Sequence, residues 1–323
     1  MARPKKHVPR DNSRRRVRVY VAIIAFIVVD VLLIVWALSS RGVVNDTAQT
    51  PRESVTAVTP EPSTSASPAE PAPPAAITAV PSTRLLAAVD ATTAWRATTG
   101  ECPATIASPE VTTDAGETWL ATDATGPTGV TALQRIIASS GDRATMFGLS
   151  QADCAPQLVR TFVGGANYSS NPTELPGTWY LDPADRARVH SPAGVLAVPC
   201  DDVVALAPRD AELAAVLCAD GRVFATADGA TTWSGPTTIA GAIALARTVD
   251  GDVAAAAGTA DCAGLQTLTL TSELAVIPAG CLPLDAPAAS LPGTVAISDG
   301  NGTLWVWHGD TLNRSTDLGA TWL

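Results

Sequence analysis

From residue 84 onward, short apolar and β-branched runs alternate with turns that are rich in Gly, Asp and Asn. Runs of this kind predict β-strands. They include residues 85–89, 130–134, 203–207, 214–218, 222–226, 265–271 and 303–307. No long stretch has the apolar spacing of an amphipathic helix. The pattern therefore predicts an all-β domain, for which we take the bounds 77–323.

A different pattern occupies the N-terminal end, where residues 20–38 form one apolar run. A helix of about 20 residues spans a hydrocarbon core of about 30 Å. Residues 1–19 are rich in Lys and Arg, whereas Arg41 alone follows the run closely. The positive-inside rule then predicts a cytoplasmic tail over 1–19, a transmembrane signal-anchor helix over 20–38, and a C-terminal domain outside the cell membrane.

Two alternatives stay open at this anchor. A cleaved signal peptide would have a shorter apolar core and a small-residue cleavage site, and "ALS" at 37–39 is a poor one. Asp30 lies in the middle of the run, where a carboxylate is costly. It either contacts a polar group of a partner helix or is a tolerated single polar residue.

Residues 39–76 differ again, because Pro, Ser, Thr and Ala dominate and aromatic residues are absent. Such a stretch has too little apolar area to fold, which predicts an extended linker.

Charge is also divided along the chain. Nine of the 21 Lys and Arg and two of the 31 Asp and Glu precede residue 42, which leaves 12 basic and 29 acidic groups and no lysine. This balance argues against a nucleic-acid partner.

An octet of the form S/T-x-D-x-G-x-T-W recurs in the domain. Residues 112–119 and 315–322 match it fully, with Asp114, Gly116 and Trp119 in the first copy and Asp317, Gly319 and Trp322 in the last. Residues 226–233, with Asp228 and Trp233, match except that the glycine falls one place early. A worn copy is a further candidate at 176–179 ("PGTW").

These octets resemble the Asp-box, or BNR repeat, of sialidase-like and sortilin-like β-propellers. The resemblance implies that each octet is the turn between the third and fourth strands of a four-stranded blade, facing away from the active site. Carboxylates of this kind can accept backbone N–H groups across their own turn, so we interpret these Asp residues as structural.

The repeats predict a propeller of five blades, at about 84–125, 128–182, 196–236, 240–282 and 286–323, or of six if "GVLAVPC" at 194–200 belongs to another. Because the last octet falls at the end of this sequence, the last blade needs a strand from elsewhere. We expect residues 77–80 ("ITAV") to pair near Thr321 and Trp322 and so close the ring.

All six cysteines lie beyond residue 100, and none forms a CxxC pair. An even number outside the membrane favours disulfides in an oxidising compartment. Position within the repeats favours three pairs among the fifteen possible connectivities: Cys102 with Cys154, Cys200 with Cys218, and Cys262 with Cys281.

The residues that could carry chemistry are few. Arg135 and Arg247 occupy matching places after "TAL" and "IAL", on strands that would line the propeller channel. They are candidate contacts for an acidic ligand, and the alternative is that they form ion pairs with acidic residues. The arginine motif, the tyrosine–glutamate pair and the acid/base aspartate of sialidases cannot be assembled. No metal-ligand spacing and no cofactor motif is recognised.

Together these features predict a membrane-anchored binding or scaffold module of a bacterial cell envelope. Its partner would be an envelope glycan or a membrane protein, and we predict no catalytic residues, metal or cofactor. Two other functions stay open. One is a glycoside hydrolase of the sialidase-like superfamily, which would need two channel-facing carboxylates near Arg135 or Arg247. The other is an assembly factor for a membrane complex, as in the photosystem-assembly propellers that share this repeat.

Overall fold

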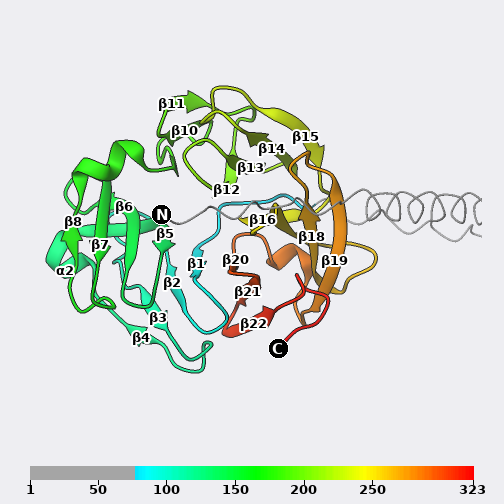
Figure 1. Ribbon diagram of the computed structural model, residues 1–323, viewed down its shortest axis with the longest axis horizontal. Helices are drawn as coiled ribbons and strands as arrows, with labels where there is room; N and C mark the ends of the chain where they lie inside the picture. Colours follow the sequence, from blue (N-terminus) through cyan, green and yellow to red (C-terminus); the bar gives the residue numbers. More distant parts are fainter. Residues whose placement is uncertain (1–76) are drawn as a thin grey trace, which may run out of the picture. The chain divides into compact units, whose positions relative to one another are not determined.

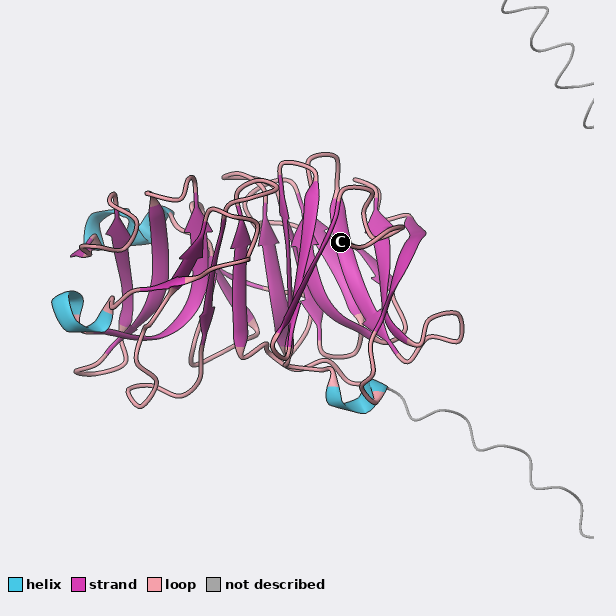
Figure 2. Cartoon of the chain, turned by 90° about the horizontal axis from the view of Figure 1, so that it is seen from below, coloured by secondary structure: helices cyan, strands magenta, loops and turns pink. Residues whose placement is uncertain are grey.

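The computed structural model describes residues 77–323, and the anchor and linker predicted for residues 1–76 lie outside this range. The described chain forms six antiparallel sheets. Figure 1 shows them arranged radially around one axis, and Figure 2 shows the strands running roughly along it. This is a β-propeller, so the predicted all-β class is confirmed.

Each sheet is a blade built from consecutive strands. The strands of blades one to three are β1 (Arg84–Ala88), β2 (Ala94–Thr98), β3 (Glu110–Thr112) and β4 (Leu120–Ala121); β5 (Val130–Ala138), β6 (Ala144–Ser150), β7 (Pro156–Thr161) and β8 (Ser169–Ser170); and β9 (Tyr180–Leu181), β10 (Arg188–Ser191) and β11 (Gly194–Ala197).

Blades four to six follow in the same way. Their strands are β12 (Val203–Pro208), β13 (Ala214–Cys218), β14 (Arg222–Thr226) and β15 (Ser234–Thr238); β16 (Ala242–Arg247), β17 (Asp252–Ala257), β18 (Gly264–Leu270) and β19 (Val276–Pro283); and β20 (Val295–Gly300), β21 (Thr303–His308) and β22 (Thr311–Ser315). Three short helices complete the domain: α2 (Thr125–Thr128), η1 (Pro172–Gly177) and η2 (Ala288–Ser290).

The second strands of the blades are buried on both faces, because neighbouring blades pack against them from either side. β17 shows the consequence for sequence: Val253 to Ala257 are all buried, and four of these five residues are alanine. Small side chains let adjacent sheets approach closely, and a continuous apolar run replaces the alternation of a sheet with one wet face. The largest apolar cluster extends from β12 to β21.

The blade count corrects the preferred sequence interpretation of five blades. Blade two ends at β8, and residues 180–197 form a further sheet. This third blade is short and carries no full octet, so its repeat signal was weak. The "GVLAVPC" stretch that left six blades open supplies β11.

Blade three lacks the strand that would face the channel. In blades one and six, Trp95 of β2 and Trp305 of β21 donate their indole N–H to the first turn of the next blade, at Ser140 and Asp90. Trp179, directly before β9, makes the same bond to the carbonyl oxygen of Asp210, in the first turn of blade four. β9 therefore occupies a second-strand position, and "PGTW" at 176–179 is not a copy of the octet turn.

The turns after the third strands are built alike in all six blades. In each one, a Ser or Thr hydroxyl at the end of the strand accepts the N–H of the second residue further on. These hydroxyls belong to Thr112, Thr161, Ser191, Thr226, Thr271 and Ser315. The hydroxyl recurs in every blade, whereas the full octet occurs in only some of them. The turns after Thr161, Ser191 and Thr271 carry no octet and could not be predicted from it.

Where the octet is present, the carboxylate caps its own turn. Asp114 accepts the hydroxyl and the N–H of Thr118 and the hydroxyl of Thr112, which lowers its pKa to about 2. Asp317 accepts the corresponding groups of Ser315 and Thr321, and its pKa also falls to about 2. Asp228 makes the same set of bonds. These three acids lie in separate blades and form no common site.

The expected closure of the ring by residues 77–80 is wrong. These residues join no sheet, and Leu323 instead returns to pair with Arg314 of β22, with an N–H···O distance of 2.8 Å. Residues 77–83 form an extended strap. Ala79 donates its N–H to Ala219, and Thr83 donates to Gly293. The strap thus passes the end of β13 in blade four, Gly258 after β17 in blade five, and Gly293 before β20 in blade six, and then enters β1.

Direct contacts between blades one and six close the ring. The amide of Ala88 donates to the Ser298 hydroxyl at 2.9 Å, and the guanidinium of Arg314 donates to Ala91 at 2.9 Å. The guanidinium of Arg96 lies between the rings of Trp119 and Trp307, 4.0 and 4.9 Å from their centroids. Side chains across the junction therefore replace a shared strand.

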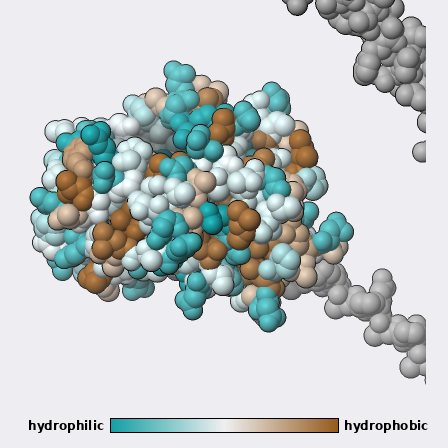
Figure 3. Space-filling model, turned by 60° about the horizontal axis from the view of Figure 1, so that its bottom comes forward, coloured by the Kyte–Doolittle hydropathy of each residue, from teal (hydrophilic) through white to brown (hydrophobic). Residues whose placement is uncertain are grey.

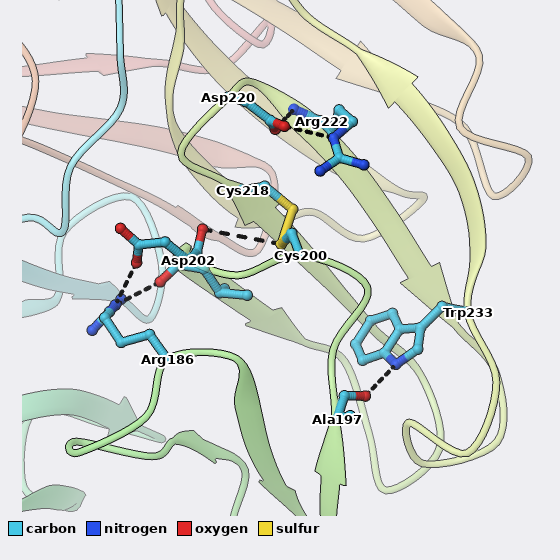
Figure 4. Close-up of a disulfide and its surroundings, with 9 residues drawn as sticks. Arg186, Ala197, Cys200, Asp202, Cys218, Asp220, Arg222 and Trp233 are labelled. Atoms are coloured by element: carbon cyan, nitrogen blue, oxygen red, sulfur yellow. Dashed lines mark hydrogen bonds and ion pairs between the residues drawn. A yellow bond between two sulfur atoms is a disulfide. The ribbon is translucent and has the colours of Figure 1, made fainter.

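Three disulfides brace the domain, in the pairs that the sequence favoured: Cys102–Cys154, Cys200–Cys218 and Cys262–Cys281. The second is drawn in Figure 4. Cys200 follows β11 and Cys218 ends β13, so this bond ties the short third blade to the fourth. Cys262–Cys281 lies within blade five. All cysteines in residues 77–323 are paired.

Candidate functional site

A cavity of about 400 Å³ lies along the propeller axis. The first strands β1, β5, β12, β16 and β20 line it, together with β9. On the face shown in Figure 3, apolar side chains are scattered among polar ones and form no broad patch. The candidate site lies inside the channel and at its ends.

Cations dominate the charged lining of this channel. The lining residues include five arginines and one acid: Arg84, Arg135, Arg186, Arg209, Arg247 and Asp299. The sequence beyond residue 41, in contrast, has more than twice as many acidic as basic residues. A cationic channel inside an acidic domain concentrates positive potential where the low-dielectric walls focus it.

Arg135 extends from β5 toward blade three. Its guanidinium donates to the carbonyl oxygen of Trp179 at 2.6 Å. Burial, with a smaller contribution from Arg247, lowers the pKa of Arg135 to about 10. The group still carries its charge at neutral pH, and a neutral carbonyl is its hydrogen-bond partner.

Arg209 and Arg247 lie on neighbouring blades, at the ends of β12 and β16. Arg247 donates to the carbonyl oxygen of Arg209 at 2.9 Å, and Arg209 donates to that of Gly251 at 2.7 Å. The Nε of Arg209 is buried and has no hydrogen-bond partner among the described residues. Carbonyl oxygens thus orient both guanidinium groups without neutralising them.

Within residues 77–323, none of these three guanidinium groups lies within 4.0 Å of a carboxylate. The ion pairs offered as the alternative for Arg135 and Arg247 are therefore not formed. We call Arg135, Arg209 and Arg247 the arginine cluster. Arg209 was not among the residues predicted from the sequence, although "ALAPR" at 205–209 parallels "ALAR" at 244–247 and could have indicated it.

Two acids lie near the cluster, and burial disfavours their charged forms. Asp252 pairs with Arg247 in the β16–β17 ladder, and desolvation raises its pKa to about 6 despite the attraction of Arg209 and Arg247. Desolvation also raises the pKa of Asp299, whose Oδ1 is buried without a partner. At neutral pH Asp252 is still mostly ionised, but the three guanidinium groups outnumber the two acids, so the cluster keeps a net positive charge.

The other two channel arginines are already engaged. Arg186 donates to the carbonyl oxygen of Val203 at 2.7 Å and lies 3.4 Å from the carboxylate of Asp202 (Figure 4). The guanidinium of Arg84 lies over the ring of Trp307, 4.3 Å from its centroid. Arg135, Arg209 and Arg247 are therefore the channel arginines whose recorded hydrogen bonds go to carbonyl oxygens alone.

The cluster lies toward one end of the channel. The antiparallel order of each blade puts the turns after first and third strands on one face, which we call the first-turn face. Arg209, Thr248 and Gly251 belong to such first turns, and the octet turns lie on the same face. The strap crosses the opposite face. The resemblance to Asp-box enzymes implies an active site away from the octets, and the cluster does not lie there.

Comparison with known proteins adds the following. No family model matches the chain, and no curated protein matches it. Among solved structures, it is similar to one described as YCF48 bound to D1 peptide, at 17% identity and a TM-score of 0.29, over 78% of this chain and 87% of the other. YCF48 from Cyanidioschyzon merolae gives 15% identity and a TM-score of 0.29, over 78% and 86%.

A third similar structure is the GH74 xyloglucanase from Xanthomonas campestris, at 16% identity and a TM-score of 0.30. That match covers 74% of this chain and 37% of the xyloglucanase. The assignment to the propeller class rests on the six sheets described above.

Proposed function

We propose that this protein is a membrane-anchored, extracytoplasmic binding module whose arginine cluster holds an acidic group of its ligand. One observation carries the proposal: Arg135, Arg209 and Arg247 line a channel with no carboxylate partner among the described residues. Arg135 and Arg209 are partly buried, and a buried charge is costly unless an opposite charge compensates it, whereas Arg247 is exposed and open to a ligand. A carboxylate or phosphate on a ligand would supply that charge and accept the free N–H donors.

The location is part of the same proposal and rests on sequence alone. Residues 1–19 would lie in the cytoplasm, 20–38 would cross the membrane once, and 39–76 would tether the propeller outside. Within residues 77–323, no helix has the length and apolar character needed to span a bilayer. The disulfides fit a compartment in which cysteines are oxidised.

The test is a pull-down with the full chain in mild detergent, applied to envelope extract. Wild type is compared with Arg135→Ala/Arg247→Ala and with the control Arg160→Ala/Arg188→Ala. The control removes the same number of charges from exposed arginines that already pair with acids. We expect wild type and control to retain one partner or glycan that the channel variant loses. Equal retention by all three proteins would exclude the arginine cluster as the binding site.

One observation bears on the glycosidase alternative. Asp252 and Asp299 both have raised pKa values near Arg247, as a general acid would require. Only Asp299, however, is among the residues that line the described channel. Double-displacement and inverting mechanisms need two carboxylates at the substrate. Hydrolysis of envelope glycans that is lost in both Asp252→Asn and Asp299→Asn would favour this alternative over a pure binding module.

A further inference from the structure

The missing first strand of blade three leaves a strand edge open to the channel. Neighbouring first strands lie alongside each other at four junctions, β1 with β5, β12 with β16, β16 with β20 and β20 with β1, but β5 and β12 do not. β9 lies between these two and is the terminal strand of its sheet. Figure 1 shows β10 and β11 of this blade further from the axis than β5 and β12, and Tyr180 and Leu181 of β9 line the cavity.

The register of β9 tells which backbone groups point into this gap. Tyr180 pairs with His190, and the N–H of Asp182 donates to Arg188 of β10. In an antiparallel ladder, alternate residues direct their N–H and C=O to the same side. The groups of Leu181 and the carbonyl of Trp179 therefore face away from β10 and toward the channel.

Contacts at either end of the gap support this direction. The carbonyl oxygen of Trp179 accepts the guanidinium of Arg135, which reaches it from β5 across the position of the absent strand. At the other end, Arg186 is bonded to Val203 at the start of β12. Phe147 and Tyr180 stack with their centroids 4.1 Å apart and form an apolar wall. The gap thus has a strand edge, an apolar wall and a cation.

We propose that an extended acidic segment of a protein partner binds in this gap as the missing first strand. Its backbone pairs with the N–H and C=O of Leu181, and a carboxylate of the segment binds Arg135. Strand addition to an open edge gives affinity through main-chain hydrogen bonds. Glycan hydroxyls could also donate and accept here, but a peptide backbone presents an N–H and a C=O at the fixed spacing of a β-ladder, which matches the N–H and C=O of Leu181. This inference rests on the proposed function, since it assigns a chemical class to the ligand of the same channel.

The experiment begins with the full chain in mild detergent and a displayed library of random linear peptides. We expect wild type to enrich peptides that share an acidic residue and are depleted of proline, and the Arg135→Ala/Arg247→Ala variant to enrich none of them. If no peptide is enriched, the inference is wrong. If an acidic envelope glycan is nevertheless captured in an arginine-dependent way, the proposed function stands without it.

The enriched peptide then tests backbone pairing. Leu181→Pro removes the N–H that faces the channel, and proline is tolerated at the outward side of an edge strand. We expect this variant to bind the peptide about tenfold more weakly, and the control Leu181→Ala, which keeps the N–H, to bind within about threefold of wild type. Equal binding by all three proteins would show that Leu181 does not pair with the ligand.

A second set of probes leaves the protein unchanged. Versions of the enriched peptide, each N-methylated at a single position, are measured against wild type. Pairing with the carbonyl of Leu181 predicts that one position loses about tenfold in affinity while its neighbours, whose N–H points away, lose little. A uniform response along the peptide would overturn the strand-addition model even if Leu181→Pro failed to fold.

Discussion

Blades five and three are held in the ring by different kinds of contact. Blade five has four strands of six to eight residues, and β17 at its centre is buried from Val253 to Ala257. Blade three has three strands of two to four residues and no first strand. Aromatic stacking and a disulfide to blade four hold it in place. Blade five is thus stabilised by strand packing, and blade three by its connections to neighbours.

The comparison also separates the two kinds of polar residue in this domain. The octet carboxylates satisfy their own turns at the rim and are complete without a ligand. The arginine cluster, beside the incomplete blade, has donors that the described residues leave free. The blade that lacks a strand and the arginines that lack acidic partners thus lie next to each other. Departures of this kind from complete packing and pairing are typical of functional sites.

Truncation of a core side chain should give the largest difference between the blades. Leu265 of β18 is fully buried, and Leu265→Ala should lower the free energy of unfolding by about 3–4 kcal/mol because it leaves a cavity. Leu196→Ala in β11, where the side chain is only half-buried, should cost less than about 1 kcal/mol. Urea unfolding measures both values, and equal losses would contradict the contrast between the blades.

Removal of one disulfide at a time should affect blade three more than blade five. Cys200–Cys218 and Cys262–Cys281 close loops of 18 and 19 residues, so chain entropy predicts nearly equal losses of about 3 kcal/mol when each pair is replaced by serine. Blade three, however, depends on its disulfide for attachment. We expect faster proteolysis within residues 182–202 only in Cys200→Ser/Cys218→Ser. Equal protection of this segment in both variants would show that packing alone holds blade three.

The acid beside the cluster should produce a pH-dependent effect. Burial raises the folded-state pKa of Asp252 to about 6, above its ordinary value of 3.8, so the folded protein binds more protons than the unfolded chain between these values. The protonated Asp252 therefore makes its full contribution to the free energy of unfolding below about pH 4, and this contribution is lost as the pH rises toward 6. Asp252→Asn should remove that loss and gain about 2 kcal/mol relative to wild type between pH 4 and pH 7. A pH-independent difference in denaturant titrations would contradict the burial of this carboxylate.

The smallest expected effect tests the position assigned to β9. Trp179 and Trp95 each donate an indole hydrogen bond to a first turn of the next blade, at 2.8 and 2.9 Å. If they are equivalent, Trp179→Phe and Trp95→Phe should each lose about 1–2 kcal/mol, the range for a hydrogen bond plus lost contacts. A loss at Trp95 without one at Trp179 would mean that the indole of Trp179 does not fix blade three to blade four.

Much of this architecture could be predicted because it is encoded locally. The octets fix third-strand turns through their own hydrogen bonds, and the cysteines fall at matching positions of the repeats. The third blade was missed in the preferred count, because Tyr180–Leu181 is too short to give a strand pattern. Closure by residues 77–80 was wrong because the sequence cannot show that Ala88, Arg96 and Arg314 already join the terminal blades.

The site was predictable only in part. Arg135 and Arg247 could be proposed from their repeat positions, and the structure places both on the channel wall. Their lack of acidic partners and the position of Arg209 depend on how separate blades face the axis. The edge of β9 is free because the ring has no first strand beside it. No residue pattern in the sequence indicates that a strand is missing. The membrane anchor and the identity of the ligand stay predictions.

Arginine footprinting would test the central claim most directly. The full chain in mild detergent is treated with phenylglyoxal, with and without saturating envelope ligand, and modification at each arginine is quantified by mass spectrometry. We predict that ligand protects Arg135, Arg209 and Arg247 and leaves Arg160, Arg188 and Arg222, which pair with acids outside the channel, unchanged. Protection of arginines outside the channel alone, with the three channel arginines unaffected, would contradict the claim that this channel binds the acidic ligand.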